Sequence, residues 1–146
     1  MLKKLSRLSR LSPADWLLLP QLVLSALVMR LCLKVMPLPR LTGFLARGAQ
    51  HRGLQGLPLL HSRYEVARLV ELADLATRVT HGQARCLARS LLLFWLLKTR
   101  EEPVELLLGI SKEAATLRGH AWIEKSGGVL GDSPELTGRF ATLLRF

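Results

Sequence analysis

The chain has 146 residues with 49% hydrophobic content, and its 21 Lys and Arg against 11 Asp and Glu give a formal net charge of +10. This size suits one globular domain that buries roughly two-thirds of its unfolded surface, which excludes a disordered chain. The two cysteines, Cys32 and Cys86, lie in segments of different character, which excludes a disulfide framework and favours the reducing cytosol.

The basic charge favours an anionic partner such as nucleic acid, a membrane surface or an acidic peptide. A protein that binds nucleic acid usually interleaves basic residues with exposed aromatic ones, whereas most Trp, Tyr and Phe residues of this chain lie in apolar runs. We therefore expect no direct contact with nucleic acid.

The N-terminus imitates a secretory signal peptide, because a basic stretch over residues 1–7 precedes an apolar stretch over residues 16–29. Pro20 interrupts the apolar stretch, and no small-x-small cleavage site follows it. The uninterrupted piece, residues 22–29, is too short to span a membrane, which needs about 20 apolar residues. The sequence therefore predicts a cytoplasmic protein, and it leaves open a peripheral membrane contact through this helix.

A first helix is expected from Pro13 to about Met36. Ser12 suits the N-cap, Pro13 suits the first helical position, and Asp15 lies in the first turn. The predicted helix is buried or partly buried.

Pro37 and Pro39 must end this helix, since proline lacks an amide donor and restricts the residue before it. Residues 37–60 read as a connector, in which four glycines allow short turns or a broken helix. His51 and His61 lie in or beside it, with no carboxylate at metal-ligand spacing. Both are expected to face solvent or to form local hydrogen bonds.

Two further helices are expected. One begins near Ser62, an N-cap candidate with Glu65 at the capping-box spacing, and its apolar residues recur at helical period through Arg78. The other extends from residue 84 or 85 to residue 97 or 98 and is apolar on nearly every side. Such a helix forms the core of a domain.

Strand patterns follow these helices. Residues 104–110 are a strong strand candidate, and the polar residues 111–116 are expected to form a loop. Residues 120–124 alternate as a half-buried strand does. A turn at residues 126–128 and a return strand at residues 129–132 complete a hairpin. The side chains on one face of the first of these hairpin strands are His120, Trp122 and Glu124.

Cys86 is expected in the first turn of the core helix, where free N–H groups and the helix dipole favour a thiolate. His120 could accept the thiol proton and later give it to a leaving amine, and Asp132 could fix the imidazole tautomer. This pattern is typical of papain-like or transglutaminase-like thiol enzymes. The predicted fold is α+β, with N-terminal helices followed by a core in which the nucleophile begins a helix packed on a small antiparallel sheet.

The register of the hairpin decides whether His120 and Asp132 meet. A turn centred on residue 126 or 127 puts them within about one residue of direct opposition. A slip of one residue would send the two side chains to opposite faces, and the sequence leaves this open. Gln83, just before the nucleophile, is an oxyanion candidate through its side-chain amide, alongside the Cys86 N–H.

Each of these residues also has a structural interpretation. A free cysteine is often simply buried, and Cys32 fits that interpretation. An aspartate after glycine is common turn chemistry. The three residues in the order Cys-helix-strand-His-strand-Asp are less easily explained by chance. No zinc site is expected, because the spacings CxxC, HxxxH and HExxH do not occur.

Four segments carry a resemblance to a known family: residues 85–91 (RCLARSL), 109–110 (GI), 120–124 (HAWIE) and 130–132 (LGD). They resemble the lasso peptide B2 proteins, which are transglutaminase-like leader peptidases related to the C-terminal domain of the microcin J25 processing protein. The resemblance is strong over residues 60–146, and the preceding apolar helix is also similar. Ser90, which matches a serine of that family, is interpreted as packing or hydrogen-bonding support.

The resemblance implies a cysteine endopeptidase that removes the leader from a ribosomally synthesised lasso precursor, through an acyl-enzyme on Cys86. It implies three partners: the precursor leader, a separate leader-recognition (B1) protein, and a macrolactam synthetase resembling asparagine synthetase. The recognition protein is expected to be separate because only about 60 residues precede the peptidase core. The predicted division is an N-terminal helical region with its connector, residues 1–57, and a transglutaminase-like core, residues 58–146.

Two alternatives stay open. The chain could be a thiol acyltransferase or transglutaminase-like enzyme, or it could be a non-catalytic scaffold of a peptide maturation complex. No cofactor is expected, and the sequence does not decide whether a nucleotide is required.

Overall fold

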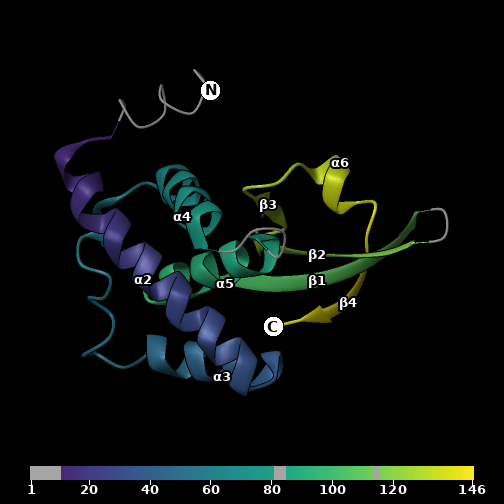
Figure 1. Cartoon of the computed structure of the whole chain (residues 1–146), viewed down its shortest axis with the longest axis horizontal. Coiled ribbons are helices and arrows are strands. Elements are labelled where there is room, and N and C mark those ends of the chain that lie inside the picture. Colours follow the sequence, from purple (N-terminus) through teal and green to yellow (C-terminus); the bar gives the residue numbers. More distant parts are fainter. Residues whose placement is uncertain (1–10, 81–84, 114–115) are drawn as a thin grey trace.

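The computed structural model describes residues 11–80, 85–113 and 116–146, with helices in the N-terminal half and strands in most of the C-terminal half (Figure 1). The helices are α2 Pro13–Val35, α3 Leu38–Ala49, the short 3₁₀-helix η1 His61–Arg63, α4 Val66–Thr80, α5 Arg85–Lys98 and α6 Pro134–Thr137. The strands are β1 Val104–Glu113, β2 Thr116–Lys125, β3 Gly128–Leu130 and β4 Ala141–Arg145. They form one antiparallel sheet in the order β3-β2-β1-β4, so the predicted α+β class is confirmed.

Helix α2 begins where the sequence predicts. The N–H of Asp15 donates to Ser12 Oγ over 3.2 Å, and the N–H of Ser12 donates to Asp15 Oδ2 over 2.8 Å, which is a capping box. The buried Asp15 carboxylate also lies 2.6 Å from Arg68 Nη2 of α4. This ion pair connects the first turn of α2 to α4.

Helix α2 continues through Pro20. The apolar stretch of the helix is therefore longer than the uninterrupted piece over residues 22–29, which by itself is too short to span a membrane. Within the described ranges it is the one helix long and apolar enough to cross a membrane, a property shared by core helices of soluble proteins. Leu18 is fully buried, whereas Trp16 and Leu24 are 59% and 63% exposed. The helix therefore covers the core with one side and presents apolar side chains on another.

The predicted connector over residues 37–60 contains a regular helix, α3. Leu41, Leu45 and Ala49 recur every four residues and are all buried, and this apolar stripe outweighs the glycines of the segment. Pro39 fits because it lies in the first turn of α3, where its missing N–H would have no partner within the helix.

Helix α4 begins later than predicted, because the expected N-cap, Ser62, lies in η1 and α4 starts at Val66. The buried ring of His61 explains the difference. Its Nδ1 is 2.6 Å from the Pro58 carbonyl oxygen, and its Nε2 is 2.9 Å from Thr99 Oγ1, just after α5. One contact is the local hydrogen bond that the sequence predicts, and together they hold this segment as a turn.

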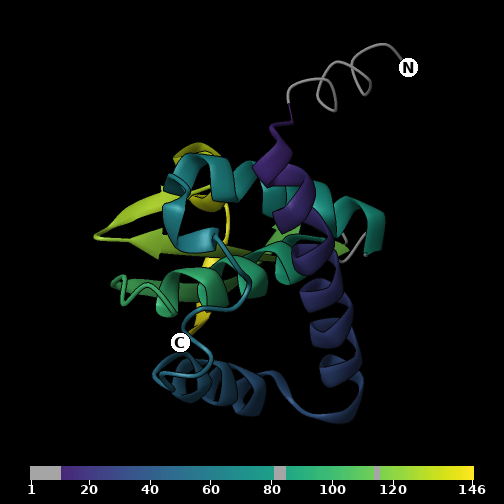
Figure 2. The same ribbon diagram turned by 90° about the vertical axis from the view of Figure 1, so that its left-hand side faces the viewer.

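Helix α5 is the centre of the hydrophobic core, as predicted. It contacts α2, α3 and α4 on one side and β1 and β2 on the other. Figure 2 shows α2, in purple and blue, extending along the helical side of the molecule towards α3. One buried cluster joins side chains from both sides of the predicted boundary between residues 57 and 58, and that division of the chain stays a prediction. The fully buried leucines of α5 include Leu91, Leu92, Leu96 and Leu97.

The β1–β2 ribbon is longer than the sequence predicts. Backbone pairing continues as far as Glu113 with Thr116, so residues 111–113 and Thr116 belong to strands rather than to the predicted loop, and β2 begins before the predicted residue 120. Polar segments can pair in this way because an antiparallel ribbon tolerates solvent beside it. Figure 1 shows the ribbon extending away from the helices.

Candidate functional site

Cys86 is the second residue of α5, in the helical turn that the sequence predicts. A hydrogen bond with His120 is the largest cause that lowers the pKa of its thiol. Burial acts in the opposite direction, and hydrogen bonds from the backbone of Ala121 and Leu87 lower the pKa further. Leu87 lies in the first turn, whose N–H groups have no partner within the helix, so the helix start itself favours the thiolate.

His120 lies on β2, and its Nε2 is 3.0 Å from Asp132 Oδ2. Because that nitrogen faces the carboxylate, the other ring nitrogen, Nδ1, is left for the thiol of Cys86. The hydrogen bond with Asp132 and then that with Cys86 raise the pKa of His120 to about 9, while burial acts against them. At neutral pH the imidazole is therefore protonated, and its charge favours the thiolate form of the neighbouring Cys86.

Asp132 is held by two side chains at the same oxygen. Arg89 Nη2 of α5 lies 2.7 Å from Asp132 Oδ2, the oxygen that His120 also contacts. Burial by itself raises the pKa of Asp132, but the hydrogen bonds from His120 and Arg89 outweigh it and lower the pKa below its usual value. The carboxylate therefore stays ionised while its side chain is only 8% exposed.

The hairpin between these residues has a two-residue turn. Ser126 and Gly127 form it with φ angles of 51° and 78°, which confirms the predicted turn. The last backbone pair of β3 joins Leu130 to Ile123. The predicted return strand over residues 129–132 therefore ends two residues early.

If this pairing continued, Asp132 would lie opposite Ala121 and would face away from His120. Gly131 prevents this, because its φ of 77° turns the chain out of the strand. A Cβ atom at Gly131 would lie 2.8 Å from Val70 Cγ1 of α4, so the turn is also packed closely against a helix. The hairpin register therefore does not bring Asp132 to His120. Instead the chain leaves the strand at Gly131, and this turn places Asp132 beside His120.

Two aromatic rings lie beside the imidazole of His120. The centroid of Phe140 is 5.0 Å from that of His120, and the centroid of Trp122 is 6.0 Å away, both in stacked orientation. Trp122 Nε1 donates to Glu124 Oε1 over 3.0 Å, in agreement with the predicted shared face of the strand. The sequence contains no pattern that would have indicated Phe140, which follows α6.

Arg89 and Ser90 follow Cys86 on α5 by about one helical turn. Ser90 Oγ donates to the Ala121 carbonyl over 2.9 Å in a buried contact, which agrees with its predicted supporting role. Sequence reasoning assigned no role to Arg89. Arg89 follows Cys86 by three residues, which places the two side chains on one side of the helix. This spacing is the sequence feature that could have indicated a role for Arg89 in the site.

The other candidates do not join this cluster. Gln83 lies outside the described residues. Cys32 is half-buried against the hydrophobic core, in line with its structural interpretation, and His51 is exposed. Among the residues that the structure describes, no three His, Cys, Asp or Glu side chains gather as metal ligands.

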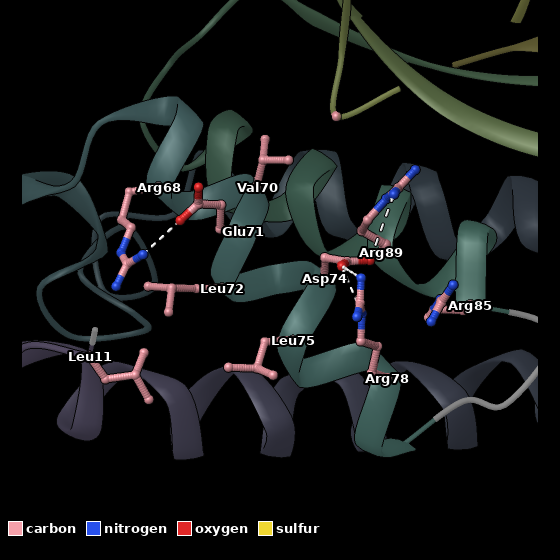
Figure 3. A pocket seen from close by; sticks show the side chains of 11 residues that line it. Leu11, Arg68, Val70, Glu71, Leu72, Asp74, Leu75, Arg78, Arg85 and Arg89 are labelled. Carbon is pink, nitrogen blue, oxygen red and sulfur yellow. Dashed lines mark hydrogen bonds and ion pairs between the residues drawn. The ribbon is translucent and has the colours of Figure 1, made fainter. Parts of the chain in front are cut away.

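A cleft of about 760 Å³ adjoins the cluster on the side of α4 (Figure 3). Its lining includes Arg85 and Gly131, which flank Cys86 and Asp132 in the sequence. Figure 3 shows Arg89 reaching towards Asp74 across the cleft wall.

This arrangement can perform acyl chemistry. A thiolate can attack a carbonyl carbon, and a protonated imidazole can give its proton to the leaving group. A carboxylate on the far nitrogen holds the ring in the orientation that both steps need.

Comparison with known proteins agrees with this chemistry. Residues 29–145 match the family model of the transglutaminase-like superfamily, whose fold is typical of cysteine-based hydrolases and acyltransferases. No curated protein and no solved structure matches the chain significantly. Since the match covers well over half of the sequence, the chain belongs to the transglutaminase-like superfamily.

Proposed function

We propose that the chain is a cysteine endopeptidase that removes the leader from a ribosomally synthesised lasso precursor peptide. The main supporting observation is the Cys86 thiol beside His120, whose Nε2 is 3.0 Å from Asp132. The superfamily supports thiol-dependent hydrolysis or acyl transfer. The choice of substrate rests on the resemblance of residues 85–91 and 120–124 to the lasso peptide B2 proteins.

In the proposed reaction, the thiolate of Cys86 attacks the last carbonyl of the leader. The scissile C–N bond breaks as the imidazolium of His120 gives its proton to the amine of the core peptide. Water then attacks the thioester as His120 takes a proton from it, and the C–S bond breaks to return the thiolate of Cys86. The products are a leader with a free carboxylate and a core peptide with a free amine, and Asp132 orients the ring throughout.

We further propose that the reaction occurs in the cytoplasm with partner proteins. A separate leader-recognition protein would present the leader, and a macrolactam synthetase resembling asparagine synthetase would receive the core peptide. The proposed steps use side chains and water and require neither a cofactor nor nucleic acid. Adding a nucleotide to the cleavage assay would decide whether the assembled system needs one.

Incubation with candidate lasso precursor peptides, with and without a candidate leader-recognition protein, tests the proposal. Mass spectrometry should find two peptides whose masses sum to the precursor plus one water. Cys86→Ala should abolish cleavage, whereas Cys32→Ala, the matched thiol control, should cleave normally. Cleavage by a folded Cys86→Ala protein would disprove the proposal.

The same experiment separates the two alternatives. An acyltransferase would leave the leader joined to an added amine, so its mass would differ from that of the free acid by the mass of the amine minus one water. A scaffold would support maturation after its thiols are alkylated with iodoacetamide. Either result would replace the peptidase proposal.

We also propose a peripheral membrane contact through α2. Its exposed Trp16, Leu24 and Leu31 and the neighbouring basic Lys34 are the combination that favours an anionic lipid surface. The full chain should float with vesicles that contain anionic lipid, and Leu24→Gln should weaken this. Failure of the unmodified chain to float would contradict the contact.

A further inference from the structure

Arg89 and Asp132 form a buried ion pair beside the imidazole. Arg89 Nη2 lies 2.7 Å from Asp132 Oδ2, and the two side chains are 13% and 8% exposed. That oxygen is also 3.0 Å from His120 Nε2, so one carboxylate oxygen joins the guanidinium to the ring. Buried pairs of this kind are strong because little water competes for the charges.

Arg89 is also anchored on its other side. Its Nη1 is 3.8 Å from Asp74 Oδ1 of α4, and Asp74 Oδ2 is 2.6 Å from Arg78 Nη2 (Figure 3). The Nε of Arg89 is buried and has no hydrogen-bond partner among the described residues, a cost that the two carboxylate contacts offset. The guanidinium of Arg89 therefore lies between the carboxylate of Asp74, on helix α4, and the carboxylate of Asp132, on the irregular segment after β3.

Asp132 needs such an anchor because no strand holds it. Strand β3 ends at Leu130, and Gly131 turns the chain away from the ladder. Among the described residues, the side chains that contact the Asp132 carboxylate are His120 and Arg89. Of these two, Arg89 is the one carried by the same helix as Cys86.

We propose that Arg89 is a positioning residue, which fixes Asp132 against His120 so that the imidazole presents its other nitrogen to Cys86. Helix α5 then carries both the thiol and the group that aligns the carboxylate, and the spacing of three residues sets the two at one site. This inference rests on the proposed thiol chemistry and is independent of the peptide substrate.

Two effects of removing Arg89 have opposite signs, which makes the proposal testable. If Asp132 stayed in place, loss of a nearby positive charge would favour the imidazolium, and its pKa would rise above about 9. If Asp132 lost its position, His120 would lose its main hydrogen-bond partner, and its pKa would fall towards 6.5. Positioning predicts the fall. The charged and titratable groups around the pair are Cys86, Arg89, His120, Asp132 and Asp74.

The experiment measures the rate of iodoacetamide alkylation of Cys86 from pH 4 to 10, in a Cys32→Ala background that leaves one thiol. The profile reports the two apparent pKa values of the thiol–imidazole pair. Arg89→Gln should lower the upper value by about one pH unit or more. Arg89→Lys keeps the charge and should restore part of the loss. Arg78→Gln, the matched control, removes an arginine that also pairs with Asp74 but does not contact Asp132, and should leave the profile unchanged.

An upper pKa that rises or stays constant in folded Arg89→Gln would overturn the proposal. Far-UV circular dichroism checks folding, and if that variant does not fold, Arg89→Lys and Asp74→Asn take its place, each with a smaller shift in the same direction. No shift in either would also overturn the proposal. Because alkylation needs no substrate, a shifted profile without any leader cleavage would retain the role of Arg89 and reject the peptidase proposal alone.

Discussion

Helix α5 and the segment after β3 both bring a side chain to His120, but they hold it by different means. Cys86 lies in the first turn of a helix whose later turns are mostly buried between the other helices and the sheet. Asp132 lies between β3 and α6, where a glycine turn and two polar contacts set its position. The thiol can move only if the core moves, whereas the carboxylate depends on a few local interactions.

The largest expected effect comes from the core of α5. Leu92→Ala removes a fully buried side chain and should lower the free energy of unfolding by about 2–5 kcal/mol. Urea denaturation measures this. Leu143→Ala in β4, where the side chain is 60% exposed, should change it by less than about 0.5 kcal/mol. Equal losses in the two variants would mean that α5 is not the structural centre.

The turn before Asp132 gives the next largest effect. Gly131→Ala forces a side chain into a positive-φ conformation, 2.8 Å from Val70 Cγ1, and should cost about 2–3 kcal/mol. Gly127→Ala is the matched control, since its φ of 78° is the same but its surroundings are open, and it should cost only about 1 kcal/mol.

Val70→Ala should recover part of the loss in the Gly131→Ala background, which a double-mutant cycle would measure. Equal costs at Gly131 and Gly127 would show that contact with α4 does not hold the segment.

The stability of the chain should depend on pH through two titrating groups, His120 and Cys86, whose contributions have opposite signs. Folding raises the pKa of His120, so its stabilising contribution is complete below about pH 6.5 and is lost as the pH rises towards 9. Folding lowers the pKa of Cys86, so its contribution is present above the unfolded thiol pKa and is lost as the pH falls through the folded pKa. Between these limits the two slopes oppose each other, and the unmodified chain should show little pH dependence.

Cys86→Ala removes the contribution of the thiol to the pH dependence of stability and leaves that of His120. The variant also loses the part of the His120 pKa shift that Cys86 causes, so the folded pKa should lie below about 9. Between pH 6.5 and that folded pKa, stability should fall by up to about 1.4 kcal/mol for each pH unit, measured by urea denaturation. Cys32→Ala should keep the original profile. A flat profile in Cys86→Ala would show that His120 is not held protonated by Asp132.

The smallest expected effect concerns the contact between α5 and β2. Ser90→Ala removes a buried hydrogen bond to the Ala121 carbonyl and should cost about 1 kcal/mol. The variant should also unfold at a lower temperature than the unmodified chain. It should lose the reactivity of Cys86 at that same lower temperature. A cost below experimental error would assign the α5–β2 contact to apolar packing alone.

Much of the architecture was readable from the sequence because it depends on local chemistry. Ser12 as the N-cap of α2, the apolar helix that begins at Arg85 and a turn at Ser126 and Gly127 were all predicted correctly. Predictions failed where contacts between distant segments decided the result. His61 bonds to Thr99 and delays α4, and residues 111–113 and Thr116 pair in strands although a polar loop was predicted there. The predicted return strand over residues 129–132 ends at Leu130, because Gly131 turns the chain.

The sequence by itself determined three of the helices and the β-hairpin, the thiol at a helix start and the strand that carries His120. It could do so because helical periodicity, capping and alternation act over a few residues. Only the tertiary structure decided how Asp132 reaches His120, since the strand register points it the wrong way and Gly131 corrects this. The same holds for Arg89, which reaches the carboxylate of Asp132 from α5, and for Phe140, which stacks on the imidazole of His120.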